Sequence, residues 1–413
     1  MARIGVGNVN AERSIRVMHV VGGSLHGGAA KGALNLHKSL LKIGIDSFIL
    51  NGYADRNVSN LISNLSLRLI SRVFARLDNL IVRIFISRVR VLFSPGLTGI
   101  SINGIIRKYE IDVVHLHWIN LGFFDVADLD SIQVPIVWTV RDAWPFTGGC
   151  HIPMGCKKFQ NGCFECEQLG GFQPFDLAHF LYNRKLRIIS QSSELIAVAI
   201  SPFIQKQIRQ SKIWRGLRVK MIENSIDFSE LYKFNKEDAR RRLGLDGDKL
   251  IVLVGNDSGE IWKGRHIVKR LVSDLSSDRF ELVSFGRGEP YGKCKNFGFF
   301  ENPHALSTLY SAVDVFIFPS TYEPFGKALF EAAYCGAGVI SYAETGTADF
   351  YSESYSSWWK LIELGNYDQL LAQLQTWRKS GDPSSATKQL EARFDERNIA
   401  TKYQQLYQKI LVR

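Results

Sequence analysis

Acidic residues and long apolar runs are both in short supply in this chain of 413 residues. It has 40 Asp and Glu against 51 Lys and Arg, a formal net charge of +11. That excess favours polyanionic partners, such as nucleic acid, anionic lipid or a phosphorylated substrate, without choosing among them. The longest apolar runs are interrupted by arginine, as at Arg83, so none is long enough to cross a bilayer. The first residues also lack the apolar core of a signal peptide, and we therefore expect a cytoplasmic protein.

Cysteine is also scarce, but four of the six cysteines lie within 17 residues. In a cytoplasmic protein we expect thiols or metal ligands rather than disulfides. Four clustered thiolates, the last two spaced as CxxC, suit a tetrahedral structural zinc ion, with packing thiols as the alternative. The candidate ligands are Cys150, Cys156, Cys163 and Cys166, with His151 as a substitute for one of them.

Strand-like and helix-like patterns alternate along the chain in two series. Short apolar runs typical of buried strands occur at 15–21, 45–50, 111–117, 134–140, 194–200, 249–255, 279–286 and 313–319. Because the chain is long for one core, the alternation predicts an α/β protein with two Rossmann-like, doubly wound domains. We expect an N-terminal domain at 1–222, a C-terminal domain at 223–382 and a helical segment at 383–413.

A glycine-rich segment at 22–28 joins the first strand pattern to a helical pattern at 29–41. No Gly-Lys-Ser/Thr follows it, and its glycine spacing differs from the dinucleotide fingerprint, so it is neither of these phosphate motifs. Such a loop can bring backbone amides to a phosphate, or it can serve as a tight turn.

Two carboxylates, Glu323 and Glu331, flank the start of a predicted helix in the second half of the chain. Glu323 lies in a loop after an apolar run, and Glu331 lies about two turns into the helix, so the two reach different parts of a ligand. Between them Gly326 allows close approach to the backbone, and the free amides of the helix start favour an anion. The arrangement suits a sugar attached to a phosphate.

Other polar residues follow strand patterns, where the ligand sites of α/β domains lie. His115 and His117 end one pattern and share a face of it by alternation. Arg141 and Asp142 follow the next pattern. Since arginine stays charged and cannot act as a base, we expect Arg141 to bind an anionic acceptor or a phosphate.

A further polar group, Asn256, Lys263 and Arg265, follows the strand pattern at 249–255. A lysine at a helix start is disfavoured by the helix dipole unless an anion lies nearby, so Lys263 is expected to face a phosphate. Asn256 cannot neutralise charge, and Arg265 can supply the charge that it lacks.

The segment 61–93 has a strongly helical apolar pattern. Five arginines share one stripe of the predicted helix, and only Asp78 opposes their charge. The stripe predicts a helix lying on an anionic membrane surface, and the alternative is a core helix with a solvated basic face. The arginines of the stripe are Arg68, Arg72, Arg76, Arg83 and Arg90.

The Glu323–Glu331 pair, HLHW at 115–118, WPFTGGC at 144–150, the cysteine cluster and Lys263-Gly264 together resemble the retaining glycosyltransferases of family four. The resemblance covers about residues 15–374, and the WPFTGGC segment is similar to a subgroup for exopolysaccharide and colanic-acid-type assembly. It implies the GT-B fold, with a last helix that crosses back to the first domain. It also implies metal-independent transfer of a sugar from a nucleotide diphosphate sugar to a glycan or lipid-linked acceptor, with no cofactor for catalysis, on the inner face of the membrane.

The resemblance also assigns roles to individual residues. It implies catalytic roles for His117, Lys263 and Glu323, and donor binding by Gly27, Gly28, Asn256, Arg265, Phe325, Gly326, Lys327, Ala328 and Glu331. Arg141 and Asp142, within a cysteine-rich loop at 142–171, are expected on the acceptor side.

Some positions depart from the family pattern. Asn256 stands where a basic residue is usual, and Arg141 where histidine is usual. The alternative function is therefore a catalytically weak or inactive protein that binds sugar nucleotides or glycans with the same fold. A nucleic-acid binder is disfavoured, because the basic residues are not interleaved with aromatic ones.

Overall fold

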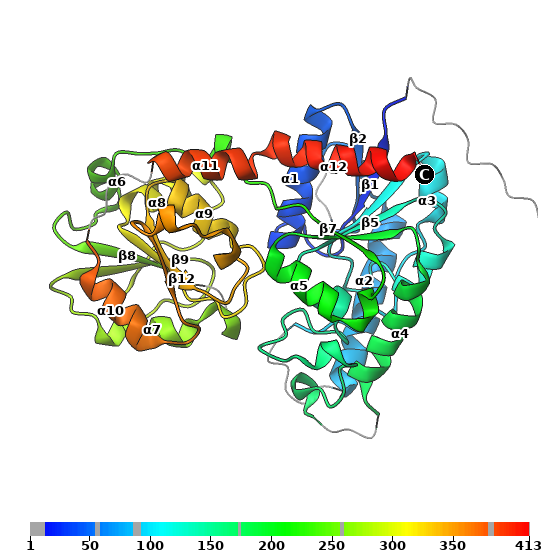
Figure 1. The fold of residues 1–413 in the computed structure, drawn as a ribbon, viewed down its shortest axis with the longest axis horizontal. Coiled ribbons are helices and arrows are strands. Elements are labelled where there is room, and N and C mark those ends of the chain that lie inside the picture. The colour runs from blue at the N-terminus through cyan, green and yellow to red at the C-terminus, as the bar shows by residue number, and fades with distance from the viewer. Residues whose placement is uncertain are drawn as a thin grey trace, which may run out of the picture.

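The computed structural model describes residues 13–53, 58–85, 92–171, 175–256, 260–378 and 384–412. They form two lobes that lie side by side, each built around one β-sheet (Figure 1). Every strand pair recorded within a sheet is parallel, which requires crossover connections, and helices supply most of them. Central strands such as Ile136–Val140 and Leu195–Ala199 are buried along their whole length, as parallel strands covered on both faces are.

The sheet of the first lobe has seven strands in the order β3-β2-β1-β4-β5-β6-β7. The order reverses between β1 and β4, and ligand sites of such sheets lie at that reversal. The strands are β1 (Arg16–Val20), β2 (Asp46–Leu50), β3 (Leu61–Ile62), β4 (Val113–Leu116), β5 (Ile136–Val140), β6 (Leu195–Ala199) and β7 (Arg218–Met221). The helices are α1 (Gly28–Lys42), α2 (Leu65–Phe85), α3 (Asn103–Lys108), α4 (Leu177–Gln191) and α5 (Pro202–Gln210).

The sheet of the second lobe has six strands in the order β10-β9-β8-β11-β12-β13, with its reversal between β8 and β11. The strands are β8 (Leu250–Gly255), β9 (Phe280–Phe285), β10 (Lys295–Asn296), β11 (Val315–Phe318), β12 (Gly338–Tyr342) and β13 (Trp359–Ile362). The helices are α6 (Lys236–Leu243), α7 (Arg265–Asp274), α8 (Pro303–Ala312), α9 (Lys327–Tyr334) and α10 (Tyr367–Thr376).

Two consecutive helices, α11 (Ser384–Phe394) and α12 (Glu396–Leu411), run from the second lobe back across the first (Figure 1). α11 begins beside α9, and Phe394 at its end packs on the rings of Phe325 and Phe330. α12 buries its apolar side against α1 and the first sheet, in one core with Val17 and Leu36. The last helix therefore ties the two lobes together through buried contacts.

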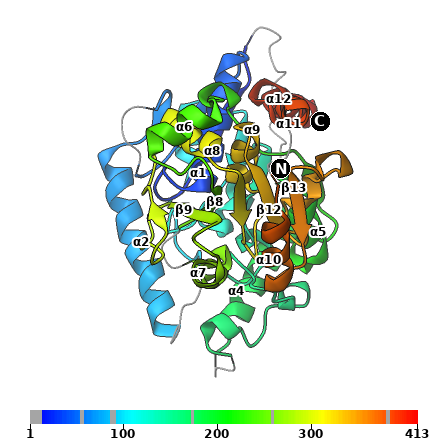
Figure 2. The same cartoon turned by 90° about the vertical axis from the view of Figure 1, so that its left-hand side faces the viewer.

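Helix α2 runs along an outer edge of the first lobe (Figure 2). The helix predicted for 61–93 begins later, because Leu61 and Ile62 pair with β2 as the edge strand β3. Residues 86–91, which include Arg90 of the predicted arginine stripe, lie outside the described residues.

Candidate active site

A cavity of about 740 Å³ opens between the lobes and is lined by residues of both. A second cavity of about 340 Å³ extends it towards the sheet of the second lobe, and Lys31, Lys327, Ala328 and Glu331 line both. The second cavity also reaches three further predicted site residues, Lys263, Glu323 and Gly326. The two cavities therefore bring together four of the nine residues predicted to bind a donor and two of the three predicted catalytic residues.

Glu323 lies in the loop after β11 and contacts the starts of two helices. Its Oε2 atom is 3.0 Å from Nζ of Lys263, which precedes α7, and its Oε1 atom accepts a hydrogen bond of 3.1 Å from the amide of Gly326, at the start of α9. The side chains of Glu323 and Lys263 are 14% and 29% exposed, so the pair is partly screened from water. Each carboxylate oxygen is held by a different element, which fixes its orientation in the cavity.

Gly326 supplies a turn that other residues rarely adopt. Its φ of 82° lies in the left-handed region, and a Cβ atom there would collide with the side chain of Thr347. A substitution would therefore move the start of α9 and the amide that Glu323 accepts.

Three helices that begin beside the cavities have glycine at the N-cap and no side-chain cap. They are α1 with Gly27, α7 with Gly264 and α9 with Gly326. Six other described helices, α4, α5, α6, α8, α10 and α12, have an Asp, Ser or Asn cap that accepts a backbone hydrogen bond. Helix starts without such a cap keep amides available, and these are suited to anions.

Glu331 is paired with Lys327 one turn earlier on α9, at 3.0 Å. Burial works against the charge of Lys327, but the charge and hydrogen bond of Glu331 outweigh it and raise the pKa of Lys327. Both side chains line the two cavities. A carboxylate and an ammonium thus lie together where a ligand would contact the first two turns of α9.

Asn256 and Arg265 form a pair behind the cavity wall. Asn256 is fully buried, its Oδ1 accepts a 3.1 Å bond from Arg265, and its Nδ2 donates to the carbonyl of Gly288 at 2.9 Å. The neighbouring Gly255 lines the smaller cavity, whereas Asn256 and Arg265 are not among the residues that line it. Asn256 therefore holds the guanidinium and the loop at Gly288 rather than facing the cavity.

The three remaining predicted donor contacts, Phe325, Gly27 and Gly28, lie in different surroundings. The ring of Phe325 is buried among Phe330, Phe350 and Phe394, so only its backbone is free to approach the cavity. Gly27 caps α1 and Gly28 begins it, and both are exposed. Neither glycine lines the larger cavity, but their neighbours do.

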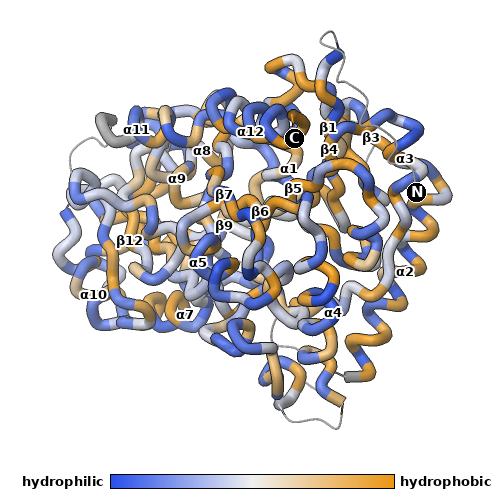
Figure 3. Tube along the Cα trace, turned by 45° about the vertical axis from the view of Figure 1, so that its right-hand side comes forward, coloured by the Kyte–Doolittle hydropathy of each residue, from blue (hydrophilic) through white to orange (hydrophobic). Residues whose placement is uncertain are grey.

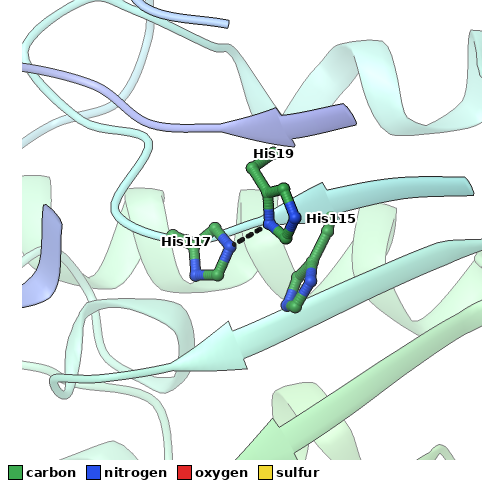
Figure 4. Close-up of side chains that lie close together, drawn as sticks. All are labelled: His19, His115 and His117. Carbon is green, nitrogen blue, oxygen red and sulfur yellow. Dashed lines mark hydrogen bonds between the residues drawn. The ribbon is translucent and has the colours of Figure 1, made fainter. Parts of the chain in front are cut away.

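His117 belongs to a buried cluster with His19 and His115 (Figure 4). Its Nε2 is 2.8 Å from Nδ1 of His19, and its ring stacks on that of His115 with centroids 4.2 Å apart. Burial first, then the charges of His115, Arg141 and His19, hold the pKa of His117 well below its usual range. His117 is therefore a neutral imidazole near neutral pH, and its Nδ1 has no hydrogen-bond partner in the structure.

The three imidazoles are also the one group of described residues whose potential ligand atoms lie close enough for a metal, within 4.8 Å of one another. Their surroundings oppose a cation. Both nitrogens of His115 already bond at 2.7 Å to the hydroxyls of Tyr407 and Thr139, and the charge of Arg141 lowers the pKa of all three rings. We interpret the cluster as a polar link from α12 to the first sheet.

Arg141 and Asp142 are adjacent in sequence but turn to different partners. Arg141 donates to the side chain of Asn224, and Gly32 of α1 leaves room for its guanidinium. Burial lowers the pKa of Arg141 to about 10, so it stays charged at neutral pH. Asp142 lies 2.6 Å from Nδ1 of His151 and accepts from the amide of Trp144. Together with His117 they line a small cavity of about 10 Å³.

The four clustered thiols line one cavity in the loop that follows β5. They belong to Cys150, Cys156, Cys163 and Cys166. All four are free in the structure, with Cys150 and Cys163 buried and the other two half-buried.

Helix α2 carries hydrophobic and hydrophilic residues along its whole length (Figure 3). Its inner side holds Leu67, Ser71 and the nearly buried Asp78. Its outer side exposes Leu65, Leu69, Ile70, Val73, Leu77, Leu80 and Ile84 by 43–72%. Within the described part of the chain, no helix has both the length and the apolar character needed to cross a membrane. The outer side of α2 therefore carries apolar side chains as well as arginines.

Sequence reasoning missed several polar and charged residues of the cleft. Lys31 lines both cavities, and His26 and Glu230 line the larger one. A signal existed for Lys31, because it follows Gly27 by one helical turn and so lies on the same end of α1. Glu230 is in a short turn after the inter-lobe connection, where no periodic pattern indicates its direction.

Comparison with known proteins agrees with this geometry. Residues 235–393 match the family model described as "Glycosyl transferases group 1". The chain is 26% identical over 327 residues to the Escherichia coli K12 protein named "Putative colanic acid biosynthesis glycosyl transferase WcaC", covering 76% of this chain and 80% of that protein. It is 25% identical over 187 residues to an uncharacterized glycosyltransferase of Methanocaldococcus jannaschii, covering 42% of this chain and 46% of that protein.

Solved structures share the arrangement of the two lobes. HepE of Anabaena, crystallised with UDP and glucose, superposes with a TM-score of 0.62 at 16% identity over 96% of this chain and all of that one. Sucrose-phosphate synthase of Thermosynechococcus elongatus gives 0.68 at 17% identity over 96% of this chain and 99% of that one. The predicted fold is confirmed: the chain has the GT-B fold of these structures, and its residues 235–393, fewer than half of the chain, match the glycosyl transferases group 1.

Proposed function

We propose that this protein is a retaining glycosyltransferase that moves a sugar from a nucleotide diphosphate sugar to a hydroxyl of a glycan or lipid-linked acceptor, without a catalytic metal. The single observation that carries the proposal is the contact of Glu323 with Lys263 and with the amide of Gly326 inside the inter-lobe cavities. The HepE structure, solved with UDP and glucose, and the E. coli relative named for colanic acid biosynthesis support this class of donor and product.

In this proposal the diphosphate lies between the starts of α1, α7 and α9. The uncapped helix starts that follow Gly27, Gly264 and Gly326, together with the ammonium of Lys263, stabilise its charge, which grows as the sugar–phosphate bond breaks. Glu323 positions the sugar through its hydroxyls, and Glu331 accepts hydrogen bonds from the ribose. His117, which lines the separate small cavity rather than the two larger ones in this structure, contacts the sugar from the first lobe as the cleft closes.

The reaction needs no protein nucleophile. The bond between the anomeric carbon and the phosphate oxygen breaks, and a bond to the acceptor oxygen forms on the same face. The leaving diphosphate takes the electron pair of the broken bond, and the proton of the acceptor hydroxyl passes to it. The protein then contributes orientation and electrostatic stabilisation rather than a covalent intermediate.

Release of nucleoside diphosphate from a panel of donors, with and without a glycan acceptor, tests the proposal. We expect the wild-type chain to release diphosphate from at least one donor and Glu323→Gln to do so at least 100-fold more slowly, since precise positioning contributes about that much. Glu353→Gln, an exposed carboxylate of the same lobe, is the matched control. Donor binding without turnover in the wild-type chain would instead support a non-catalytic sugar-nucleotide-binding protein.

We also propose that α2 rests on an anionic membrane and brings a lipid-linked acceptor to the cleft. Its apolar side chains and its arginines share the outer surface, and none of the ion pairs of the described residues involves Arg72, Arg76 or Arg83. Such a surface inserts apolar groups among lipid headgroups while its arginines meet their phosphates. An open cavity at the start of α2 shares Val58 with the inter-lobe cavity, which connects the two places.

Co-sedimentation with vesicles tests this partner. We expect binding to vesicles that contain phosphatidylglycerol, weaker binding to phosphatidylcholine alone, and release by high salt, because screening weakens the phosphate contacts. Leu77→Ser with Leu80→Ser should reduce binding several-fold, while Leu364→Ser, an exposed leucine of the second lobe, should not. Equal binding by the double variant would exclude α2 as the membrane surface.

A further inference from the structure

The loop after β5 is held by few regular elements, yet it folds around four thiols. Between Thr147 and Gly171 the structure has only short turns of 3₁₀ helix, at Lys158–Gln160 and Glu167–Leu169. The four sulfurs of Cys150, Cys156, Cys163 and Cys166 line one cavity of about 70 Å³, whose lining is otherwise mostly apolar. A long segment with so little secondary structure needs another source of order.

Backbone amides are aimed at three of the four sulfurs. The amide of Lys158 donates to Sγ of Cys156 at 3.4 Å, and that of Gly148 donates to Sγ of Cys163 at 3.2 Å. The amides of Gln168 and Leu169 act on the sulfur of Cys166 in the same way. A metal-bound thiolate accepts such bonds more strongly than a neutral thiol, so the same amides would support a bound ion.

A buried lysine supplies positive charge beside the thiols. Lys185 of α4 is 1% exposed, donates to the carbonyl of Trp144 at 2.6 Å and lies 3.7 Å from the centre of that indole ring. None of the ion pairs of the described residues involves it, although a buried lysine normally has an anionic partner. Burial lowers the pKa of Lys185 to about 7, and the nearby Cys163 and Cys150 act in the opposite direction.

We propose that Cys150, Cys156, Cys163 and Cys166 bind a structural zinc ion in the cavity that they line. Four thiolates and Zn²⁺ carry a net charge of −2, which Lys185 and the aimed amides offset. Tetrahedral Zn–S bonds of about 2.3 Å place sulfurs about 3.8 Å apart. Among the described residues, no three of these sulfurs lie within 4.8 Å of one another, so binding would draw the four side chains inward from the cavity wall. Binding displaces the thiol protons, which makes retention of zinc pH-dependent.

The ion would order one wall of the acceptor side. His151 follows Cys150 directly and holds Asp142 on one nitrogen and Ser94 on the other, at 2.6 and 2.9 Å. A closed site with four protein ligands leaves no position for a substrate, so the ion acts on the fold rather than in the reaction. Its presence is therefore independent of whether the proposed transfer occurs.

Metal analysis of the full chain, purified without a metal-binding tag and without chelator, tests the site. We expect about one zinc per chain, released as about four thiols react with a mercurial reagent in the presence of a zinc indicator. Cys163→Ser should retain less than about a tenth of the zinc, while Cys294→Ser and Cys335→Ser, buried thiols elsewhere, should retain all of it.

Two further measurements keep the proposal falsifiable if Cys163→Ser fails to fold. A strong chelator should lower the melting temperature of the wild-type chain, and Lys185→Met should lose zinc to that chelator several-fold faster. A wild-type chain without zinc, in which all six thiols react once it is denatured, overturns the proposal in favour of packing thiols. A denatured chain with only two reactive thiols overturns it in favour of disulfides.

Discussion

Nζ of Lys263 lies 3.0 Å from Oε2 of Glu323, although 60 residues separate them in the chain. The contact exists because β8 and β11 are neighbours at the reversal of strand order, so the loops that follow them meet at one edge of the sheet. It joins the start of α7 to the start of α9 and places one charge of each sign in the cavity.

Replacing Lys263 should slow the chemical step more than it weakens donor binding. Lys263→Met removes the ammonium that we assign to the leaving diphosphate, and we expect kcat to fall roughly 100-fold, as when one preorganised charge stabiliser is lost. Steady-state kinetics with a saturating acceptor measures this. Lys269→Met, an exposed lysine further along α7, should keep full activity. A higher KM with unchanged kcat would assign Lys263 to donor binding alone.

Replacing Glu331 should act on the nucleotide rather than on the sugar. Glu331→Gln weakens the hydrogen bonds to ribose, and we expect nucleoside diphosphate to bind about 10-fold more weakly, equivalent to about 1.4 kcal/mol. Titration calorimetry with the diphosphate alone isolates this effect. The exposed Glu237→Gln serves as the control. Unchanged diphosphate affinity would show that Glu331 does not contact the nucleotide.

Acid should destabilise the protein through its buried histidines. Burial is the main cause that lowers the pKa of His37 from 6.5 to about 4, against a raising effect of its hydrogen bond to Ser59. Folding favours the neutral form of His37. Its contribution to the free energy of unfolding is therefore fully present above pH 6.5 and is lost as the pH falls towards 4. Urea unfolding at pH 7.5 and pH 5 should differ by less in His37→Gln than in the wild-type chain.

The same pH experiment has a clear contrary outcome. If His37→Gln and the wild-type chain lose the same free energy of unfolding between pH 7.5 and pH 5, His37 is not the group responsible. The His19, His115 and His117 cluster has pKa values lowered in the same direction and would then account for the acid sensitivity.

The bond between α12 and the first sheet should contribute measurably to stability. Tyr407 donates or accepts at 2.7 Å with Nδ1 of buried His115, and Tyr407→Phe leaves that nitrogen without a partner. We expect a loss of about 1–3 kcal/mol in the free energy of unfolding. Tyr232→Phe, at an exposed ring, should cost little. Equal stability of the two variants would mean that apolar packing alone holds α12.

The fold was predictable where strands are buried on both faces. The strands β1 and β8 were predicted from their apolar runs, because both faces of these strands are covered and few polar residues interrupt them. Five strands were missed for identifiable reasons. β3 and β10 are only two residues long, β7 and β13 are edge strands that carry arginine or lysine, and β12 carries Gly338 and Ser341 within its short apolar run.

The site was predictable to the level of residues but not of their partners. Carboxylates around a glycine at a helix start are suited to a sugar linked to an anion. This chemistry alone was enough to predict Glu323, Gly326 and Glu331 as site residues. The pairing of Glu323 with Lys263, and the turn of Arg141 towards Asn224, depend on which loops meet in three dimensions. Which face of α2 points outward could not be predicted either, because periodicity defines a stripe of residues but not which side of the helix is buried.

The most direct test of the central claim is the melting temperature of the wild-type chain across a panel of nucleoside diphosphates and nucleotide diphosphate sugars. A ligand that binds the folded state at about 100 times its Kd stabilises it by about 2.7 kcal/mol, which raises the melting temperature by a few degrees. We predict such a rise for at least one nucleotide sugar and its loss in Lys263→Met with Glu331→Gln. No rise with any nucleotide, or an equal rise in the double variant, would contradict the assignment of the inter-lobe cleft as the donor site.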